Sequence, residues 1–391
     1  MKIHTVKDGE KIADIAIEYG ISEETVRSCN ALNEGEAASG EELLILTPTR
    51  TYTVKRGDTP ERLAMRFGVS RRELLANNPD ISGKGLFVGQ RLALRYGEPS
   101  LGMGVANGYF YKGCSLPALR RSMPYLTYVT VAAAVAEEEK ITELFDSEPI
   151  MAEIEEGGKI PLLRVYDKCE ERKFSDEGER EKYTDTLIEA ARRGGYKGIA
   201  LSEAKESEGY GEFLVLLRKK MIGCDLILIT EISEEAPSFM NEYADGSFLS
   251  YDKYSLDNPP DFEGGERRVM ADYACLAESS KTFISLPSMA RWGRGYCSIS
   301  DAVATARQYG CKIECDEKTL LCSFDCARRG KFVYNSLKNV EQTLKLVAEL
   351  GYMGICFDIM RAPLSHLMMY NNLFRTAYHT NVRAAEGCSK E

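Results

Sequence analysis

The chain is short of histidine and tryptophan, with three histidines and one tryptophan among its 391 residues. His4 and His379 lie near opposite ends, which argues against zinc catalysis by a histidine cluster. The longest apolar stretch, 129–136, falls far short of the ~20 residues of a membrane-spanning helix. No apolar run follows the first charges, so we expect a protein made in the cytoplasm without a signal peptide. We also expect no cofactor, no metal and no membrane partner.

The charge balance is acidic: 50 Lys and Arg stand against 60 Asp and Glu, for a net charge of −10. This disfavours a nucleic-acid partner. Hydrophobic residues make up 44% and charged residues 28%, which is typical of packed globular proteins. The length allows two to four domains, or one large α/β barrel with attachments.

Two internal repeats open the chain, at 3–48 and 51–96 with an offset of 48. Alternating residues predict a strand at each end of a repeat, and apolar spacing of three and four predicts two helices between them. Gly20 and Gly68 stand where a helix-terminating glycine is expected, and Ser22 and Ser70 cap the next helix. Each repeat is therefore expected to fold as βααβ.

The repeats resemble the LysM module. The second contains the family's Gly-Asp-Thr first turn, a helix-end Asn78 and a Gly-Gln before the last strand, whereas the first has Gly-Glu-Lys and Gly-Glu at these places. The resemblance implies binding of N-acetylglucosamine-containing glycan, peptidoglycan or chitin, between the first turn and the loop before the last strand. The implied contacts are Gly57, Asp58, Thr59, Pro79, Asp80 and Ile81, with Gly9 and Glu10 in the first repeat. Alternatively, Asp58 and Asn78 only satisfy backbone groups of a turn and a helix end.

The two repeats differ in charge. Residues 1–48 hold four basic and ten acidic side chains, and residues 49–97 hold ten basic and four acidic. Independent drift of solvated faces explains this most simply. The alternatives are packing of the modules against each other, or approach of the basic module to an anionic wall polymer.

Eight strand-like segments follow, most of them separated by amphipathic helices. Such alternation predicts a (β/α)8 TIM barrel, over residues 98–391, behind two small LysM domains at 1–48 and 49–97. Residues 311–335 break the alternation and predict an inserted antiparallel hairpin. The expected strands are 107–111, 125–131, 160–166, 198–204, 225–230, 247–251, 281–286 and 353–358.

This barrel resembles the family 18 glycoside hydrolases, in particular spore-associated N-acetylglucosaminidases that degrade cortex fragments. The matching motifs, in chain order, are Asn107-Gly108-Tyr109, Pro124-Tyr125-Leu126-Thr127-Tyr128, Pro161-Leu162-Leu163, Gly195-Tyr196, Leu249-Ser250-Tyr251-Asp252 and Gly354-Ile355. Enzymes of this family use the substrate's own acetamido group as nucleophile. The resemblance implies a glutamic acid that protonates the leaving oxygen, and an aspartate two residues earlier on the same strand face.

The fourth strand departs from that pattern. The four carboxylate positions of the family's Asp-x-x-Asp-x-Asp-x-Glu motif are Lys197, Ala200, Ser202 and Ala204. Glu203 is offset by one residue and is expected to face the opposite side of the strand. A bulge would rescue it, and Glu206 or Glu208 could also supply an acid. The simpler interpretation of Glu203 is a charge near the strand end.

The tryptophan that usually floors the family's sugar subsite is missing at the end of the eighth strand, where Asp358 follows Phe357, so that stacking platform is lost. Five residues at the barrel mouth nevertheless suggest a remnant pocket. These are Tyr109, Tyr251, Asp252, Trp292 and Asp358. Trp292, in a loop after the seventh strand, could stack on a sugar, and Tyr251 could hold an acetamido group. Packing is an equally good interpretation of both side chains.

Twelve cysteines remain, four of them in the inserted hairpin as Cys-x3-Cys-x6-Cys-x3-Cys. Spacing of four along a strand places sulfurs ~13 Å apart, which disfavours zinc. Buried thiols are the default, and cross-strand disulfides need close Cα atoms. The resemblance adds oxidation and cross-linking on the spore, with Cys388 as an exposed site.

The leading hypothesis is therefore a spore-coat or spore-surface protein that binds N-acetylglucosamine-containing glycan through its LysM modules. Its barrel would have lost family 18 catalysis. The alternatives are an active N-acetylglucosaminidase using a displaced acid such as Glu203, and a structural coat protein with coat-protein partners.

Overall fold

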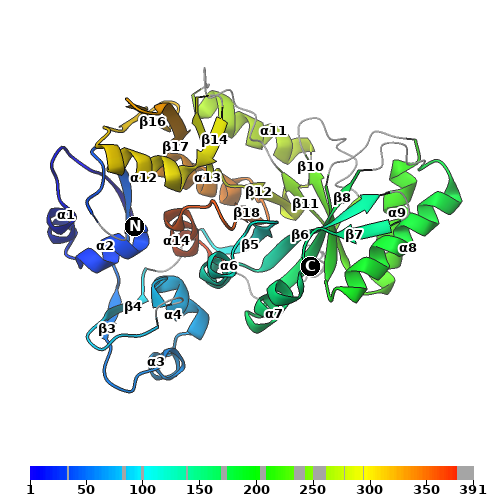
Figure 1. The fold of residues 1–391 in the computed structure, drawn as a ribbon, viewed down its shortest axis with the longest axis horizontal. Helices are drawn as coiled ribbons and strands as arrows, with labels where there is room; N and C mark the ends of the chain where they lie inside the picture. The colour runs from blue at the N-terminus through cyan, green and yellow to red at the C-terminus, as the bar shows by residue number, and fades with distance from the viewer. Residues whose placement is uncertain are drawn as a thin grey trace.

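The computed structural model describes residues 1–32, 35–81, 85–97, 101–137, 140–168, 174–202, 208–232, 243–249, 261–276, 278–293 and 295–376. Two small modules lie on one side of a large barrel, and a second sheet covers the barrel beside the first module (Figure 1). Among the described residues, no helix is long and apolar enough to cross a membrane.

Each module has the predicted βααβ order and its own buried core. Ser22 accepts a hydrogen bond from the Thr25 N–H, and Ser70 does the same for Glu73, so both second helices are capped as expected. The first module comprises β1 (Lys2–Thr5), α1 (Ile12–Tyr19), α2 (Glu23–Cys29) and β2 (Glu42–Ile45); the second comprises β3 (Arg50–Thr53), α3 (Pro60–Phe67), α4 (Arg71–Asn77) and β4 (Arg91–Arg95).

The predicted barrel of eight parallel strands is confirmed. The strands pair in the order β5-β18-β12-β11-β10-β9-β8-β6, and β5 also pairs with β6, which closes the sheet on itself. They are β5 (Met103–Phe110), β6 (Tyr128–Glu137), β8 (Ile160–Asp167), β9 (Gly198–Leu201), β10 (Ile227–Ile232), β11 (Gly246–Leu249), β12 (Thr282–Ser285) and β18 (Gly354–Asp358).

Helices connect and cover these strands. They are α6 (Leu116–Ser122), α7 (Glu148–Glu156), α8 (Glu177–Arg193), α9 (Tyr210–Gly223), α11 (Arg268–Leu276), α13 (Leu337–Glu349) and α14 (Leu364–Leu373), with the short turns η1 (Met123–Tyr125), η2 (Glu263–Arg267) and η3 (Ser279–Lys281). Two short strands extend the sheet, β7 (Lys140–Glu143) beside β6 and β19 (Arg375–Thr376) beside β5.

The insertion is larger than the predicted hairpin over 311–335. It forms a five-stranded antiparallel sheet that begins before residue 311, because Met289–Trp292 pairs with Gly295–Ser298 on one side and with the later strand Gly330–Asn335 on the other. Its elements are β13 (Met289–Trp292), β14 (Gly295–Ser298), α12 (Ile299–Tyr309), β15 (Glu314–Cys315), β16 (Leu321–Cys326) and β17 (Gly330–Asn335). We call this unit the insert sheet.

Both modules dock on the barrel rather than hang from linkers. In the second module, Arg72 donates to the backbone carbonyl groups of Pro124 and Leu126, and the Tyr125 hydroxyl donates to the Ala76 carbonyl at 2.9 Å. Buried residues of both modules belong to the same continuous core as the outer layer of the barrel. The modules are therefore held at fixed positions against the barrel.

Candidate functional site

The first turn of the second module is built around Asp58. Its Oδ2 accepts hydrogen bonds from the Lys55 backbone N–H at 2.7 Å and from the Tyr52 hydroxyl at 3.0 Å. The Lys55 N–H is the main reason that the pKa of Asp58 is lowered. Gly57 has φ +87°, a conformation that favours glycine, and Thr59 caps the following helix. Asp58 and Thr59 thus have backbone roles in this turn.

The first module builds the same turn from different residues. Glu10, one repeat before Asp58, accepts from the Lys7 N–H at 2.8 Å and contacts the His4 Nε2 at 2.9 Å. Burial opposes ionisation of Glu10, but these two hydrogen bonds outweigh it and lower its pKa. The departure at Gly9-Glu10 therefore keeps the turn, which residue identity alone did not reveal.

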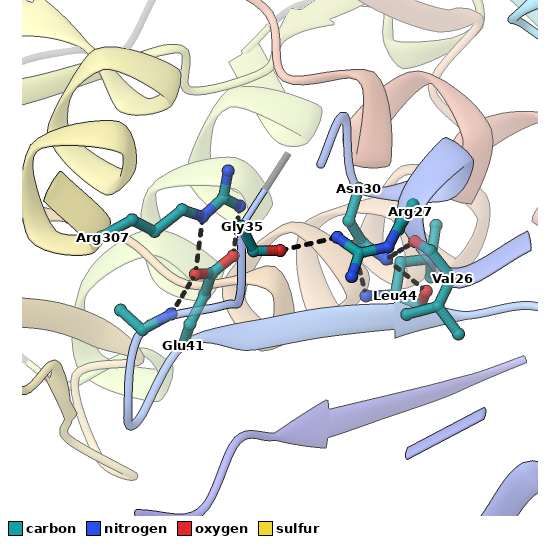
Figure 2. Close-up of polar contacts among 8 residues, drawn as sticks. Val26, Arg27, Asn30, Gly35, Glu41, Leu44 and Arg307 are labelled. Carbon is teal, nitrogen blue, oxygen red and sulfur yellow. Dashed lines mark hydrogen bonds and ion pairs between the residues drawn. The ribbon is translucent and has the colours of Figure 1, made fainter. Parts of the chain in front are cut away.

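The ends of the second helices are also equivalent. Asn78 is buried, donates to the Leu74 and Ala93 carbonyl groups and accepts from the Ala93 N–H at 2.8 Å. Asn30 makes the matching bonds in the first module (Figure 2). The backbone role proposed as an alternative for Asn78 is the one that the structure has.

The three residues after Asn78 lie in different surroundings. Pro79 is buried, and Ile81 belongs to the core of the second module. Asp80 is half-buried and lines a small crevice between the two modules, together with Glu24 of the first. Of these, Asp80 alone is accessible enough to meet a ligand through its side chain.

The loop before the last strand of the second module exposes apolar side chains. Phe87 is 56% exposed and Val88 is 71% exposed. The loop itself is fixed, because Gln90 accepts a hydrogen bond from the Phe87 N–H and Gly89 donates to the Val54 carbonyl. Sequence reasoning missed Phe87 and Val88, although two apolar residues directly before a turn glycine were a usable signal.

The equivalent loop of the first module, residues 37–41, is covered instead. Ala38 is buried in the core of the insert sheet, and the Ile313 N–H donates to the Ser39 carbonyl at 2.9 Å. A Cβ on Gly40 would lie 1.8 Å from the Ile313 carbonyl oxygen, so only glycine allows this approach. We call residues 37–41 the docking loop.

Glu41 fastens the docking loop to α12 of the insert sheet unit. Its carboxylate accepts from the Ala38 N–H, as Gln90 does from Phe87, and also pairs with both Nε and an Nη atom of Arg307 (Figure 2). Its neighbour Glu42 is buried and accepts from the Lys338 backbone N–H at 3.2 Å. Burial raises the pKa of Glu42.

At the barrel mouth, the fourth strand offers no carboxylate at its described inward positions. Ala200 belongs to the interior cluster of the barrel, whereas its neighbours Ile199 and Leu201 face the outer layer. Ser202 is buried, and its hydroxyl donates to the Val165 carbonyl at 2.9 Å. Lys197 lies exposed before the strand. Ala204, Glu203 and Glu206 lie outside the described residues, and Glu208 is exposed.

An ion pair occupies the mouth beside Ala200. Arg164 of β8 and Glu231 of β10 form two hydrogen bonds of 2.6 Å each. Arg164 is paired in register with Ala200, and Leu162 and Ile229 place both charged side chains on the inward face. Sequence reasoning missed this pair, because β10 was expected to end at residue 230. A charge two residues after an inward Ile229 was the available signal.

The other predicted mouth residues are spread over different surroundings. Tyr109 packs edge-to-face on Phe248 within the interior cluster, and Asp358 accepts hydrogen bonds from Tyr111 and Arg361. Trp292 lies on β13 of the insert sheet rather than in a loop, with its ring stacked on Phe332 at 5.9 Å. Tyr251 and Asp252 lie outside the described residues.

One described group of side chains has metal-ligand character. Glu42, Cys315 and Cys322 place one ligand atom each within 4.8 Å of one another. Cys315 and Cys322 are joined by a disulfide, so they offer no thiolate in this state.

Comparison with known proteins assigns the two N-terminal modules to a family. The model of the LysM domain family matches residues 4–45 and 52–95. The chain carries two LysM domains. The matched ranges contain both first turns, Asn30 and Asn78 at the ends of the second helices, and the loops before the last strands.

Solved structures share the whole architecture. The spore cortex-lytic enzyme SleL of Bacillus cereus superposes with a TM-score of 0.74 at 18% identity, covering 97% of this chain and 100% of that one. SleL of Bacillus megaterium gives 0.73 at 16%, covering 97% and 99%. A chitinase of Chromobacterium violaceum gives 0.58 at 16% and covers 69% of this chain and 98% of its own. The fold is thus LysM modules plus a barrel like those of family 18 glycoside hydrolases.

Curated relatives match over shorter stretches. An autolysin of Enterococcus faecalis is 34% identical over 117 residues, which are 25% of this chain and 16% of the autolysin. The putative sporulation-specific glycosylase YdhD of Bacillus subtilis is 30% identical over 136 residues, which are 34% of this chain and 31% of the glycosylase. This chain therefore spans less than a third of the length of these two relatives.

Proposed function

We propose that this protein binds N-acetylglucosamine-containing glycan of peptidoglycan or spore cortex through its second LysM domain. The observation that carries the proposal is the open loop with Phe87 and Val88, next to a turn whose shape Asp58 fixes. Apolar side chains suit the methyl and ring C–H groups of acetylated sugars, and rigid backbone groups suit their amides. The first domain contributes less, because its docking loop is covered by the insert sheet.

We further propose that the barrel does not hydrolyse the glycan. Of the four carboxylate positions in the family motif, Lys197 is exposed, Ala200 cannot ionise, and the Ser202 hydroxyl is bound to a backbone carbonyl. On the neighbouring strand β10, the inward carboxylate is Glu231, whose two oxygens are both engaged by Arg164. A leaving-group oxygen would have to displace that guanidinium to reach a proton donor.

The place of action that fits this proposal is the spore coat or spore surface. SleL is described as a spore cortex-lytic enzyme and YdhD as a putative sporulation-specific glycosylase. Coat proteins are the partners that the structural alternative would require.

A sedimentation assay tests the binding role. Full-length protein is mixed with purified peptidoglycan, and wild type is compared with Phe87→Ser/Val88→Ser. We expect the double variant to lose most of its binding, roughly tenfold, since two exposed contact residues are removed. Ile17→Ser is the matched control, because Ile17 is a 78% exposed apolar residue on the first domain. Equal binding of the double variant and wild type would contradict the proposal.

A second candidate is active hydrolysis with a displaced acid, which the SleL-like fold over 97% of the chain favours. Turnover of a chromogenic chitooligosaccharide separates the two functions. Activity that disappears in Glu203→Gln, Glu206→Gln or Glu231→Gln would establish the enzyme and identify its acid. Wild-type protein without turnover supports loss of catalysis.

A further inference from the structure

Four cysteines of the insert sheet are arranged symmetrically about its β15–β16 hairpin. Their spacing, Cys-x3-Cys-x6-Cys-x3-Cys, is the same read from either end. The two inner cysteines, Cys315 and Cys322, face each other on β15 and β16 and form a disulfide. The outer two, Cys311 and Cys326, are described as free thiols.

Continuing the register of this short ladder would bring the outer pair opposite each other as well. In an antiparallel ladder, each step back along one strand matches one step forward along its partner. The ladder itself pairs Glu314 with Ser323 and Cys315 with Cys322; continued four residues further, it would bring Cys311 opposite Cys326. An even separation along β16 also keeps Cys322 and Cys326 on one face.

The structure places the two side chains in one core. All four cysteines lie in or against the core of the insert sheet, and Cys311 and Cys326 are near enough for each thiol to shift the pKa of the other. Burial opposes ionisation of Cys326, but the backbone N–H groups of Arg328 and Arg329 outweigh it and lower its pKa. One member of the pair is thus suited to be the attacking thiolate.

We propose that Cys311 and Cys326 are a disulfide-forming pair that closes a second bridge outside Cys315–Cys322. Two thiols lose two protons and two electrons, and an S–S bond forms between the two Sγ atoms. A low-molecular-weight disulfide such as oxidised glutathione accepts them, and its own S–S bond breaks to give two thiols. The result is two nested bridges across one hairpin.

The bridges would fasten the segment that receives the first LysM domain. Ile313 lies midway between Cys311 and Cys315, and its backbone holds the docking loop through the Ser39 carbonyl and the close approach of Gly40. With one bridge, residue 311 is tied to β16 only by non-covalent contacts. With two, both ends of the receiving segment are fixed.

Peptide mapping of the full-length protein tests the pairing. The protein is equilibrated with oxidised and reduced glutathione, alkylated, digested without reductant and analysed by mass spectrometry. We expect a Cys311–Cys326 link beside the Cys315–Cys322 link, while Cys114 and Cys224, described as free thiols elsewhere in the barrel, are alkylated. Links of Cys311 to Cys322 or of Cys315 to Cys326 would overturn the proposal. So would full alkylation of Cys311 and Cys326 where the inner bridge has formed.

Cys311→Ser and Cys326→Ser give a second readout. Each is expected to leave the inner link intact and the remaining outer thiol alkylated. Under oxidising conditions, hydrogen exchange of the docking loop should be faster in both variants than in wild type with both bridges. It should be as fast in the variants as in wild type that has only the inner bridge. Exchange that is the same in wild type with and without the outer bridge would show that this bridge does not fasten the segment.

Discussion

The two LysM domains of this chain share one design and differ in what covers them. Both have a carboxylate that holds the first turn and an asparagine at the end of the second helix that hydrogen-bonds to the backbone of the last strand. In the second domain, Phe87 and Val88 before the last strand are exposed; in the first, Ala38 at the place of Phe87 is buried under the insert sheet. Duplication of the module therefore does not imply duplication of the site.

The attachments to the barrel differ in charge as well. The acidic first domain meets basic residues, with Glu41 on Arg307 and Glu42 beside Lys338. The basic second domain brings Arg72 near Lys159, a like charge, and is held by hydrogen bonds to backbone carbonyl groups. Part of the charge difference between the repeats thus follows from the surfaces on which they dock.

Gly40→Ala is expected to have the largest effect, because it combines backbone strain with a clash. Gly40 has φ +78°, and its new Cβ would lie 1.8 Å from the Ile313 carbonyl oxygen. We expect a loss of about 3 kcal/mol or more in the free energy of unfolding, with release of the docking loop. Urea unfolding and hydrogen exchange of residues 37–41 measure both.

Gly89→Ala is the matched control. Gly89 is the equivalent glycine with φ +89°, and a Cβ there would meet nothing within 4 Å among the described residues. Only the strain remains, so a loss of about 1 kcal/mol is expected. Equal losses in the two variants would refute the clash at the docking loop.

Lys159 makes the second attachment sensitive to pH. Burial, with a smaller effect of Arg72, lowers its pKa from 10.5 to about 7. Between pH 7 and pH 10.5, Lys159 is protonated in the unfolded chain but largely neutral in the folded chain. The free energy of unfolding therefore rises as pH increases through this range. From pH 6.5 to 9, we expect the free energy of unfolding of wild type to increase by about 2–3 kcal/mol relative to that of Lys159→Met. The exposed Lys197→Met should keep the wild-type pH profile; the same profile in Lys159→Met would disprove this assignment.

Glu41→Gln is expected to have the smallest effect of the three. The glutamine can still accept from the Ala38 N–H, as Gln90 does from Phe87, but the ion pair with Arg307 is lost. We expect a loss of about 1–2 kcal/mol, since Glu41 is buried and Arg307 is partly exposed. The reciprocal Gln90→Glu should change stability by less than about 0.5 kcal/mol. Thermal unfolding compares the two.

Local pattern predicted most of the fold. Each of the eight barrel strands overlaps a segment that alternating or continuous apolar residues indicated, although the segment predicted at 125–131 begins in η1 and β6 continues to Glu137. The βααβ modules follow from repeated glycines and capping serines. The first half of the insert sheet was missed, because β13 and β14 are four residues each and join the sheet through the pairing of β13 with β17, some forty residues later. No local signal reports such a distant partner.

The sites were harder to predict than the fold. The turn role of Glu10 required knowledge that His4 and Lys7 point to it, and the Arg164–Glu231 pair joins strands that lie on either side of β9. The departure of Glu41 from the family glutamine was visible in the sequence. Its meaning was not, because Arg307 is 266 residues away.

The close approach at Gly40 has a consequence for valency. Tandem binding modules on flexible linkers gain avidity, since the second module rebinds at high effective concentration. Here the docking loop of the first module is covered, so the chain would bind a glycan strand mainly through its second module. Because that module is fixed against the barrel, the glycan would be held at one distance and angle from the barrel mouth. Its affinity for long and short glycans should then be nearly the same, whereas a freely jointed pair would favour the long ones.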